Sequence, residues 1–143
     1  METEKVCPYV LRGAGDRLEV LAFRHPLAGC QLVKGSLEPG ERVVVGALRE
    51  LAEESGLVGV PAEGPAWSSP DIVHEQLWHF VPVSVPPQPD HFEFFCTDDG
   101  GHLFKFFWWP RGTVPGAQWH ESFLRVLDEI RIRRLWYSGQ YET

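Results

Sequence analysis

The order of apolar and polar positions predicts strands at the start of the chain. Two runs rich in β-branched and aliphatic residues, 5–12 and 18–25, are separated by the glycine-containing segment 13–16. Strand-forming runs joined by such a turn are typical of a β-hairpin. A shorter apolar run at 31–33 predicts a third strand, so the first quarter of the chain is expected to be mostly β-structure.

The pattern becomes helical after a Pro-Gly loop at 39–40. We expect the helix to begin at Glu41 or the residue before it and to continue to about Ser55. Gly56 then ends it, because glycine readily adopts the left-handed conformation that follows many helices. The segment 58–73 is rich in Pro, Gly and Ser, and it predicts a long connection with little regular structure.

The second half of the chain predicts three strands and a closing helix. The strands are expected at 73–85, 92–97 and 103–109, with a turn at 98–101. The apolar stripe of the helix, expected over 119–130, consists of Trp119, Phe123, Leu127 and Ile130. Strands on both sides of an internal helix favour an α/β fold with a mixed sheet, and we expect one domain over residues 1–143.

Composition narrows the classes of function. The chain is 43% hydrophobic and 23% charged, as in ordinary globular proteins. No apolar run reaches the ~18–20 residues that a membrane-spanning helix needs, and the first thirty residues lack a signal-peptide pattern. Cys7, Cys30 and Cys96 have no metal-ligand spacing and favour a cytoplasmic location. A net charge of −7 argues against duplex nucleic acid as a partner, since Lys and Arg supply most of that affinity.

The negative charge has an uneven distribution. The net charge is +1 over 1–34, −3 over 35–57, −5 over 58–118 and zero over 119–143. On a helix with about 100° per residue, three glutamates of the second segment share an arc of about 100°. They are Glu50, Glu53 and Glu54. The apolar residues expected on the opposite, core-facing side are Val44, Leu48, Leu51 and Ala52.

This acidic arc destabilises an isolated helix. Like charges three or four residues apart cost about 0.2–0.5 kcal/mol per pair, and the helix dipole adds ~0.3–1 kcal/mol near the C-terminus. A solvated acidic face is the ordinary alternative. Because a divalent cation would make every one of these interactions favourable, we interpret the cluster as a metal site. Oxygen ligands without His or Cys suit Mg²⁺ or Mn²⁺ rather than Zn²⁺.

The loop before the helix supports this interpretation. Gly35 and Gly40 allow the backbone to turn tightly, and Lys34 is a candidate for pairing with phosphate. Arg49 can reach a neighbouring carboxylate and hold the loop against the helix. The charge of Glu41 is favourable in the first helical turn.

These residues resemble the Nudix box, G-x5-E-x7-R-E-U-x-E-E-x-G-U, in which U is apolar. Gly35 and Glu41 occupy its first two defining positions, and Arg49-Glu50-Leu51-Ala52-Glu53-Glu54-Ser55-Gly56-Leu57 occupies the remainder. Every defining position over 35–57 matches. The expected order of strands and helices is also similar to the Nudix α/β/α sandwich.

The resemblance implies a hydrolase that cleaves a phosphoanhydride (pyrophosphate) bond in a nucleoside diphosphate linked to another group. It implies Mg²⁺ or Mn²⁺ bound by Glu50, Glu53 and Glu54, with Gly35 at the start of the box and Arg49 in the catalytic group. Glu41 and Gly40 would support the loop. Such metals neutralise the diphosphate and lower the pKa of a bound water that attacks phosphorus.

Two roles stay open at this level. The general base varies in the family; Glu50 is our first choice, and the alternatives outside the box are Glu93, Asp98, Asp99 and Glu121. For substrate phosphates we expect a positive patch of Arg24, His25 and Lys34. Aromatic residues on the later strands are expected to be mainly core, with one or two free to stack on a base.

Alternative functions follow from the same motif. A Nudix-fold module that binds a nucleotide without cleaving it usually lacks box glutamates, and none is missing here. Removal of an mRNA cap or a 5′-triphosphate would use the same chemistry, but the acidic chain disfavours RNA. We therefore expect a small nucleotide-diphosphate substrate and no membrane partner. A homodimer is an alternative to a monomer, because many relatives dimerise.

Overall fold

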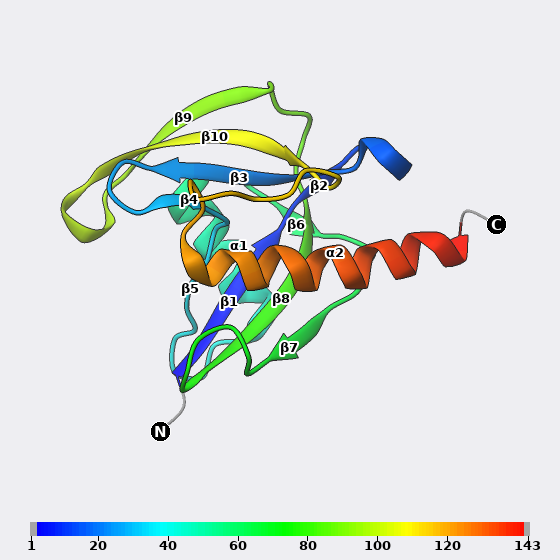
Figure 1. Ribbon diagram of the computed structural model, residues 1–143. Helices are drawn as coiled ribbons and strands as arrows, with labels where there is room; N and C mark the ends of the chain where they lie inside the picture. Colours follow the sequence, from blue (N-terminus) through cyan, green and yellow to red (C-terminus); the bar gives the residue numbers. More distant parts are fainter. Residues whose placement is uncertain (1–2, 142–143) are drawn as a thin grey trace.

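Two five-stranded sheets lie between two helices in the computed structural model (Figure 1). It describes the backbone of residues 3–141 and the side chains of residues 3–98 and 100–133. The first sheet contains β1 (Thr3–Tyr9), β5 (Gly35–Ser36), β6 (Val60–Pro61), β7 (Trp67–Ser69) and β8 (Gln76–Ser84). The second contains β2 (Leu11–Arg12), β3 (Glu19–His25), β4 (Gly29–Gln31), β9 (His91–Cys96) and β10 (His102–Pro110). The helices are α1 (Val43–Ser55) and α2 (Glu121–Tyr141), and the short 3₁₀ turns are η1 (Gly15–Arg17) and η2 (Asp98–Gly100).

The first sheet is mixed, as the sequence predicts. Strand β1 pairs in parallel with β8, from Thr3 opposite Gln76 to Tyr9 opposite Pro82. It also pairs antiparallel with β5. Strands β6 and β7 both pair antiparallel with β8. In the second sheet every pairing is antiparallel, in the order β2-β3-β10-β9 with β4 on β3.

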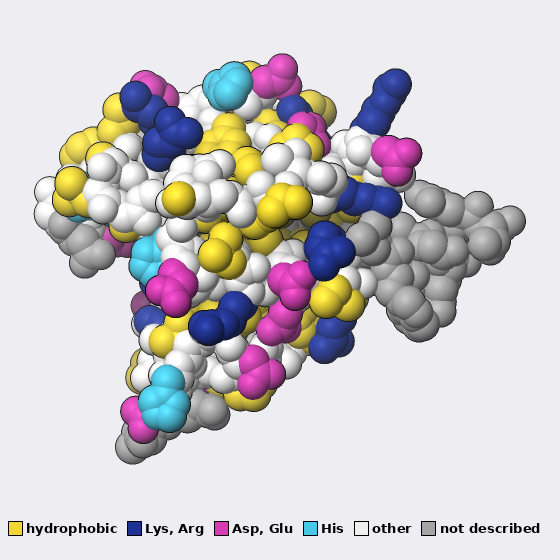
Figure 2. All heavy atoms as spheres, viewed as in Figure 1, with side chains coloured by type: hydrophobic (Ala, Val, Ile, Leu, Met, Phe, Trp, Pro, Cys, Tyr) yellow, Lys and Arg dark blue, Asp and Glu magenta, His cyan; other side chains and the backbone are white. Residues whose placement is uncertain are grey.

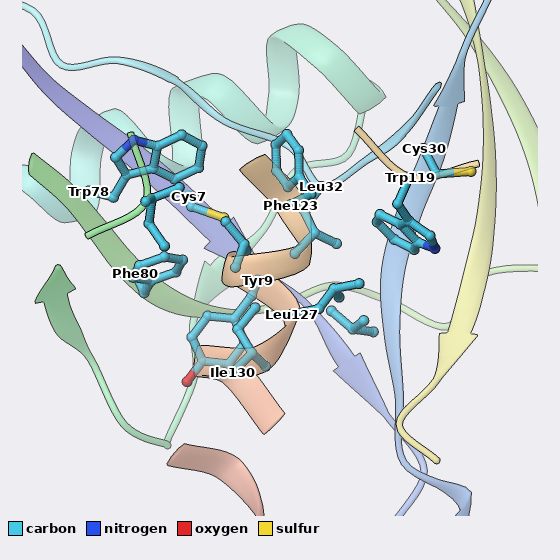
Figure 3. Close-up of a cluster of buried hydrophobic side chains, with 14 residues drawn as sticks. Cys7, Tyr9, Cys30, Leu32, Trp78, Phe80, Trp119, Phe123, Leu127 and Ile130 are labelled. Carbon is cyan, nitrogen blue, oxygen red and sulfur yellow. The ribbon is translucent and has the colours of Figure 1, made fainter. Parts of the chain in front are cut away.

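Alternation along β1 divides the interior into two apolar cores. Val6 belongs to a core covered by α1, whereas Cys7 belongs to a core covered by α2. Successive side chains of a strand point to opposite faces, so the two helices cover opposite sides of the strand layer. Figure 3 shows the second core, in which Phe123, Leu127 and Ile130 of α2 pack near Trp78 and Phe80 of β8. This α/β/α arrangement confirms the predicted fold class.

The predicted strand 5–12 is in fact two strands in different sheets. The chain leaves the first sheet at the buried residue Val10, whose carbonyl accepts a 2.9 Å hydrogen bond from the Leu21 amide. Only Leu11 and Arg12 continue as the predicted hairpin, opposite Val20 and Glu19. The local sequence pattern could not distinguish β1 from β2, because the change of sheet depends on pairing of β1 with the distant strand β8.

Two predictions about the short elements were also wrong. The strand expected at 31–33 is β4 and ends at Gln31. The connection at 58–73 contains the strands β6 and β7. Trp67 in β7 stacks on Phe80 at 4.7 Å and donates a 2.9 Å hydrogen bond to Glu129. The partners of Trp67 lie 13 and 62 residues further along the chain. The Pro and Gly content of the segment therefore did not predict this strand.

Helix α1 begins at Val43, two residues later than expected, and ends as predicted at Gly56, whose φ is +74°. The predicted core face is only partly correct. Ala47 and Leu51 are fully buried, but Val44 is 38% exposed and Ala52 is exposed. The buried face instead includes Glu50, which is 7% exposed.

The final helix also differs from its prediction at both ends. It begins at Glu121 and extends to Tyr141, well beyond the expected residue 130. Trp119 is 4% exposed, but it lies in an extended segment beside Cys30, whose amide and carbonyl bond to Gln118 and His120. The other three residues of the predicted stripe are buried as expected.

In the described range no helix is both long and apolar enough to cross a membrane.

The link between β7 and α2 predicts a stability change. Glu129 accepts hydrogen bonds from Trp67 Nε1 at 2.9 Å and from the buried Ser69 hydroxyl at 2.7 Å. Glu129→Ala leaves both donors without this acceptor, so we expect the free energy of unfolding to fall by about 1–3 kcal/mol. Urea denaturation measures the change. Glu63→Ala, at an exposed loop position, is the control and should stay within about 0.5 kcal/mol; equal effects would contradict the assigned role.

Candidate active site

The site begins where the loop after β5 meets the first turn of α1. Gly46 permits this close approach, since a Cβ there would lie 2.8 Å from both Glu41 Oε1 and Leu37 Cδ1. Gly40, with a φ of +75°, makes the tight turn that brings Glu41 back toward the helix. Sequence reasoning missed Gly46, because a glycine inside a helical pattern usually only weakens the helix.

Arg49 joins this loop to the carboxylates of the helix. Its Nε and Nη2 donate 2.8 Å hydrogen bonds to the two carboxylate oxygens of Glu41. Its Nη2 also donates to the carbonyl of Ser36 at 3.0 Å. Its Nη1 donates to Glu50 at 2.9 Å and to Glu53 at 3.2 Å. Through these hydrogen bonds Arg49 joins the loop before the helix to Glu50 and Glu53.

The Arg49 bonds keep Glu41 ionised. Together with the 3.0 Å bond from the Glu38 amide, they lower the pKa of the Glu41 carboxyl to about 2. The same contact raises the pKa of Arg49 above its usual range. A fixed ion pair between loop and helix therefore persists at every pH at which the protein is expected to work.

Glu50 lies directly beneath Gly35. A Cβ at residue 35 would be 2.0 Å from the carboxyl carbon of Glu50, closer than any real contact allows. Burial raises the pKa of Glu50 even though Arg49 donates to it. Glycine at the start of the box is thus required by the space that the Glu50 carboxylate fills.

Glu54 lies close to both Glu50 and Lys34. Burial, and then the charge of Glu50, raise its pKa to about 8, although Lys34 acts in the opposite direction. Glu53 lies at the edge, with 44% of its side chain exposed. The three predicted ligands therefore lie on one helix and range from buried to exposed.

The donor set fits a hard divalent cation. Among the side chains that the structure describes, no three His, Cys, Asp or Glu groups are already gathered as a metal cluster. Glu50 and Glu54 nevertheless present carboxylates of raised pKa, and Glu54 accepts a hydrogen bond from the backbone amide of Lys34. Buried negative charge without a full counter-charge is unfavourable, and Mg²⁺ or Mn²⁺ binds such oxygen ligands. The Arg49 contacts to Glu50 and Glu53 leave other oxygens of those carboxylates available.

Asp98 and Lys5 extend the site beyond the box. The charge of Asp98, in η2, raises the pKa of both Glu50 and Glu54, so it lies within their electrostatic reach. Lys5 donates a 2.8 Å hydrogen bond to Ser36, and its pKa is lowered by burial and by Lys34. The sequence patterns do not predict a role for Lys5, although a lysine inside an apolar strand is an available signal.

The other predicted residues have different surroundings. Glu93 lies on β9 opposite Lys105, and Glu121 is the first residue of α2. The side chain of Asp99 lies outside the described residues. The Nδ1 of His25 accepts hydrogen bonds from the amides of residues 27 and 28, and its ring packs on His102 at 4.7 Å.

The structure divides the expected phosphate patch. Lys34 lies next to the carboxylate of Glu54, whereas Arg24 lies on β3 of the second sheet. Arg24 lies opposite Lys105 on the second sheet, on the same side as Ala22 of the core beneath α2. The aromatic residues behave largely as expected. Trp78, Phe106 and Trp108 are buried, and Trp108 and Trp109 point to opposite faces of β10.

Comparisons with known proteins agree with this geometry. A family model described as NUDIX domain matches residues 4–127. A comparison with curated proteins found no match.

Solved structures match the fold. A UDP-X diphosphatase matches with a TM-score of 0.65 and 14% identity, over 100% of this chain and 65% of that chain. A NUDIX-family hydrolase from Clostridium perfringens matches with a TM-score of 0.62 and 14% identity, over 92% of this chain and 97% of that chain. An ADP-ribose pyrophosphatase from Streptococcus suis matches with a TM-score of 0.56 and 11% identity, over 89% of each chain.

The Glu41–Arg49 pair predicts a pH-dependent stability difference. A carboxyl whose pKa is lowered by folding stabilises the protein above its unfolded pKa, here 4.5, and this contribution is lost as the pH falls toward about 2. Glu41→Gln should therefore lower the melting temperature at pH 7, and the difference from wild type should shrink between pH 4.5 and 2.5. Circular dichroism measures both. Glu63→Gln is the control, and a difference independent of pH would contradict the ion-pair role.

The space above Glu50 predicts a second effect. Gly35→Ala places a methyl group where the Glu50 carboxylate lies, so the carboxylate must move or the loop must shift. We expect the free energy of unfolding to fall by about 1–3 kcal/mol. Gly112→Ala is the matched control, because its Cβ would meet no atom within 4 Å. Equal stability of the two variants would mean that this packing is unimportant.

Proposed function

The chain belongs to the NUDIX domain family, and on this premise we propose that it is a metal-dependent hydrolase. Its substrate would be a nucleoside diphosphate linked to another group, cleaved at the phosphoanhydride bond. The observation that carries the proposal is the group of carboxylates on one face of α1, in which buried Glu50 and half-buried Glu54 have pKa values raised chiefly by burial. A divalent cation would supply positive charge to these carboxylates and would also attract the phosphates of a substrate.

Glu50, Glu53 and Glu54, with Gly35 at the mouth of the box, would hold Mg²⁺ or Mn²⁺. When bound, such a cation neutralises the diphosphate and lowers the pKa of a coordinated water. The clearance at Gly35 allows Glu50 to reach this position. Arg49 fixes the side-chain orientation of Glu50 and Glu53 through its hydrogen bonds. Catalysis would then come mainly from positioning and electrostatic stabilisation.

Proton transfer and phosphate binding are assigned to residues around the carboxylates. We keep Glu50 as the first choice of general base, since burial raises its pKa and so makes its carboxylate a better proton acceptor. Asp98 is the alternative with an electrostatic link to the site. Lys34 and Lys5 provide positive charge beside Glu50 and Glu54 and would pair with substrate phosphates.

The substrate class rests on the family and on chemistry alone. The UDP-X diphosphatase and the ADP-ribose pyrophosphatase are named for two different nucleoside diphosphate compounds. At 14% and 11% identity they share a fold with this chain, so neither name selects its leaving group. The proposal therefore extends to the diphosphate linkage and leaves the second group open.

Location and assembly remain proposals as well. The three cysteines are buried and free of disulfides, which supports a reducing compartment such as the cytoplasm. We propose that residues 1–143 act as one domain. A homodimer is the alternative to a monomer.

The experiment is a substrate panel with a matched pair of variants. Nucleoside di- and triphosphates, nucleotide sugars, dinucleoside polyphosphates and coenzyme A are incubated with Mg²⁺ or Mn²⁺, and mass spectrometry identifies the bond that breaks. Glu53→Gln should lower turnover by about 10²–10³-fold, because a charged ligand is lost while the exposed position keeps its shape. Circular dichroism should show an unchanged fold.

Glu38→Gln provides the control. It removes one carboxylate of the same loop whose side chain is 64% exposed and 3.8 Å from Arg49, and it should change turnover less than about threefold. Near wild-type activity in Glu53→Gln would contradict the assigned site. Tight nucleotide binding without any cleaved product would instead favour the rival function, a module that senses a nucleotide.

A further inference from the structure

Two cationic residues lie side by side on the second sheet, away from the box. Arg24 on β3 and Lys105 on β10 are direct cross-strand partners, so their side chains share one face. Both are exposed, and neither bonds to any side chain that the structure describes, although Glu93 lies across from Lys105. Like charges directly opposite each other destabilise a sheet. In a chain of net charge −7, this pair is therefore well suited to an anionic ligand.

The cations border an open surface hollow of about 510 Å³. Besides them, it is lined by residues of β2, β3, β9, β10 and the segment before β9. These are Arg12, Glu19, Asp90, His91, Phe106, Phe107 and Trp108. In Figure 2, dark blue side chains gather over the strands of the second sheet at the upper left, next to an apolar area. None of the box residues 35–57 lines this hollow.

On one side of the hollow, Arg12 is held between two carboxylates. Arg12 bonds to Glu19 and to Asp90, both at 2.8 Å, and its guanidinium lies 4.4 Å from the ring centre of Trp108. Trp108 in turn donates a 3.2 Å hydrogen bond to the carbonyl of Pro89. Arg12 is therefore already neutralised, and Arg24 and Lys105 are the cations left to meet a ligand.

An aromatic surface adjoins the two cations. Phe107 follows Lys105 on the same face of β10, two residues and thus about 7 Å away. Its ring meets Trp109 and Trp119 edgewise, at interplanar angles of 76° and 63°. It is half-buried, and its cross-strand partner His91 is exposed. Phe107 and His91 can therefore supply a stacking surface next to the cationic pair.

We propose that this hollow is a second ligand site, distinct from the Nudix carboxylates, for a small phosphorylated aromatic compound of the nucleoside monophosphate class. Arg24 and Lys105 bind the phosphate, Arg24 through its forked donors. The base stacks on Phe107 beside His91. The sugar of a nucleotide separates its base from its phosphate, and this separation matches the distance of about 7 Å between Phe107 and Lys105. The site requires no metal and does not depend on hydrolysis.

The acidic surroundings select a small ligand over a polymer. Glu93, Asp90 and Glu19 border or line the hollow. One phosphate placed between Arg24 and Lys105 avoids these carboxylates, whereas the neighbouring phosphates of a nucleic-acid strand would approach them. Repulsion of a polyanion by the chain as a whole acts in the same direction.

The test measures binding without turnover. Glu53→Gln protein comprising residues 1–143 is titrated with AMP and UMP in EDTA, and ¹H–¹⁵N NMR follows the amides. We expect shifts concentrated on β3, β9 and β10. Arg24→Gln/Lys105→Gln should raise the Kd at least tenfold. Phe107→Leu should raise it at least threefold, and Phe107→Tyr should keep wild-type binding because its ring still stacks.

A charge-matched control separates this site from general electrostatics. Arg17→Gln/Arg131→Gln removes two positive charges elsewhere and should change the Kd less than twofold. Unchanged binding in Arg24→Gln/Lys105→Gln would overturn the proposal. So would inorganic phosphate binding as tightly as AMP, because the aromatic surface would then contribute nothing. Tighter binding of a single-stranded RNA octamer than of AMP would overturn the assignment to a small ligand.

Discussion

The hydrogen bonds of Arg49 are the interaction on which the candidate active site depends. One guanidinium bonds to Glu41 in the loop, to the Ser36 carbonyl after β5, and to Glu50 and Glu53 on its own helix. A lysine has a single ammonium group and could not bridge these four partners with fixed geometry. Because the same side chain holds the loop and aims the carboxylates, the position of Gly35 over Glu50 follows from it.

This arrangement keeps unfavourable charge in a defined place. Glu50 and Glu54 are drawn into the layer between α1 and the sheets, where burial raises the pKa of each. Gly46 and Gly35 make room for the loop and for the carboxylate. Stability is thus lower than an apolar helix face would give, and the helix presents a group of oxygen atoms suited to a cation.

Sequence patterns predicted the local features well and the long-range ones poorly. The helix of the box, its end at Gly56 and the link between Arg49 and the loop could be predicted because each depends on residues within about fifteen positions. The helical wheel wrongly placed Val44 and Ala52 in the core, since hydrophobicity alone ignores that small residues such as Gly46 and Ala47 mark the side of closest packing. The split at Val10 and the strands β6 and β7 depend on β8, which no local pattern reveals. The place of Lys5 in the site also depends on a distant partner, since it bonds to Ser36.

The parallel pairing of β1 with β8 has a consequence for how the protein folds. Thr3 meets Gln76, so a loop of about seventy residues must close before the first sheet exists, and such closure carries a large entropic cost. Contacts this distant slow folding. During synthesis, β1 and the whole of the box emerge from the ribosome well before β8, and at about 5–20 residues per second β1 waits several seconds for its partner. The carboxylates of α1 are therefore brought to the sheet late, and the site is completed only when the chain is more than half made.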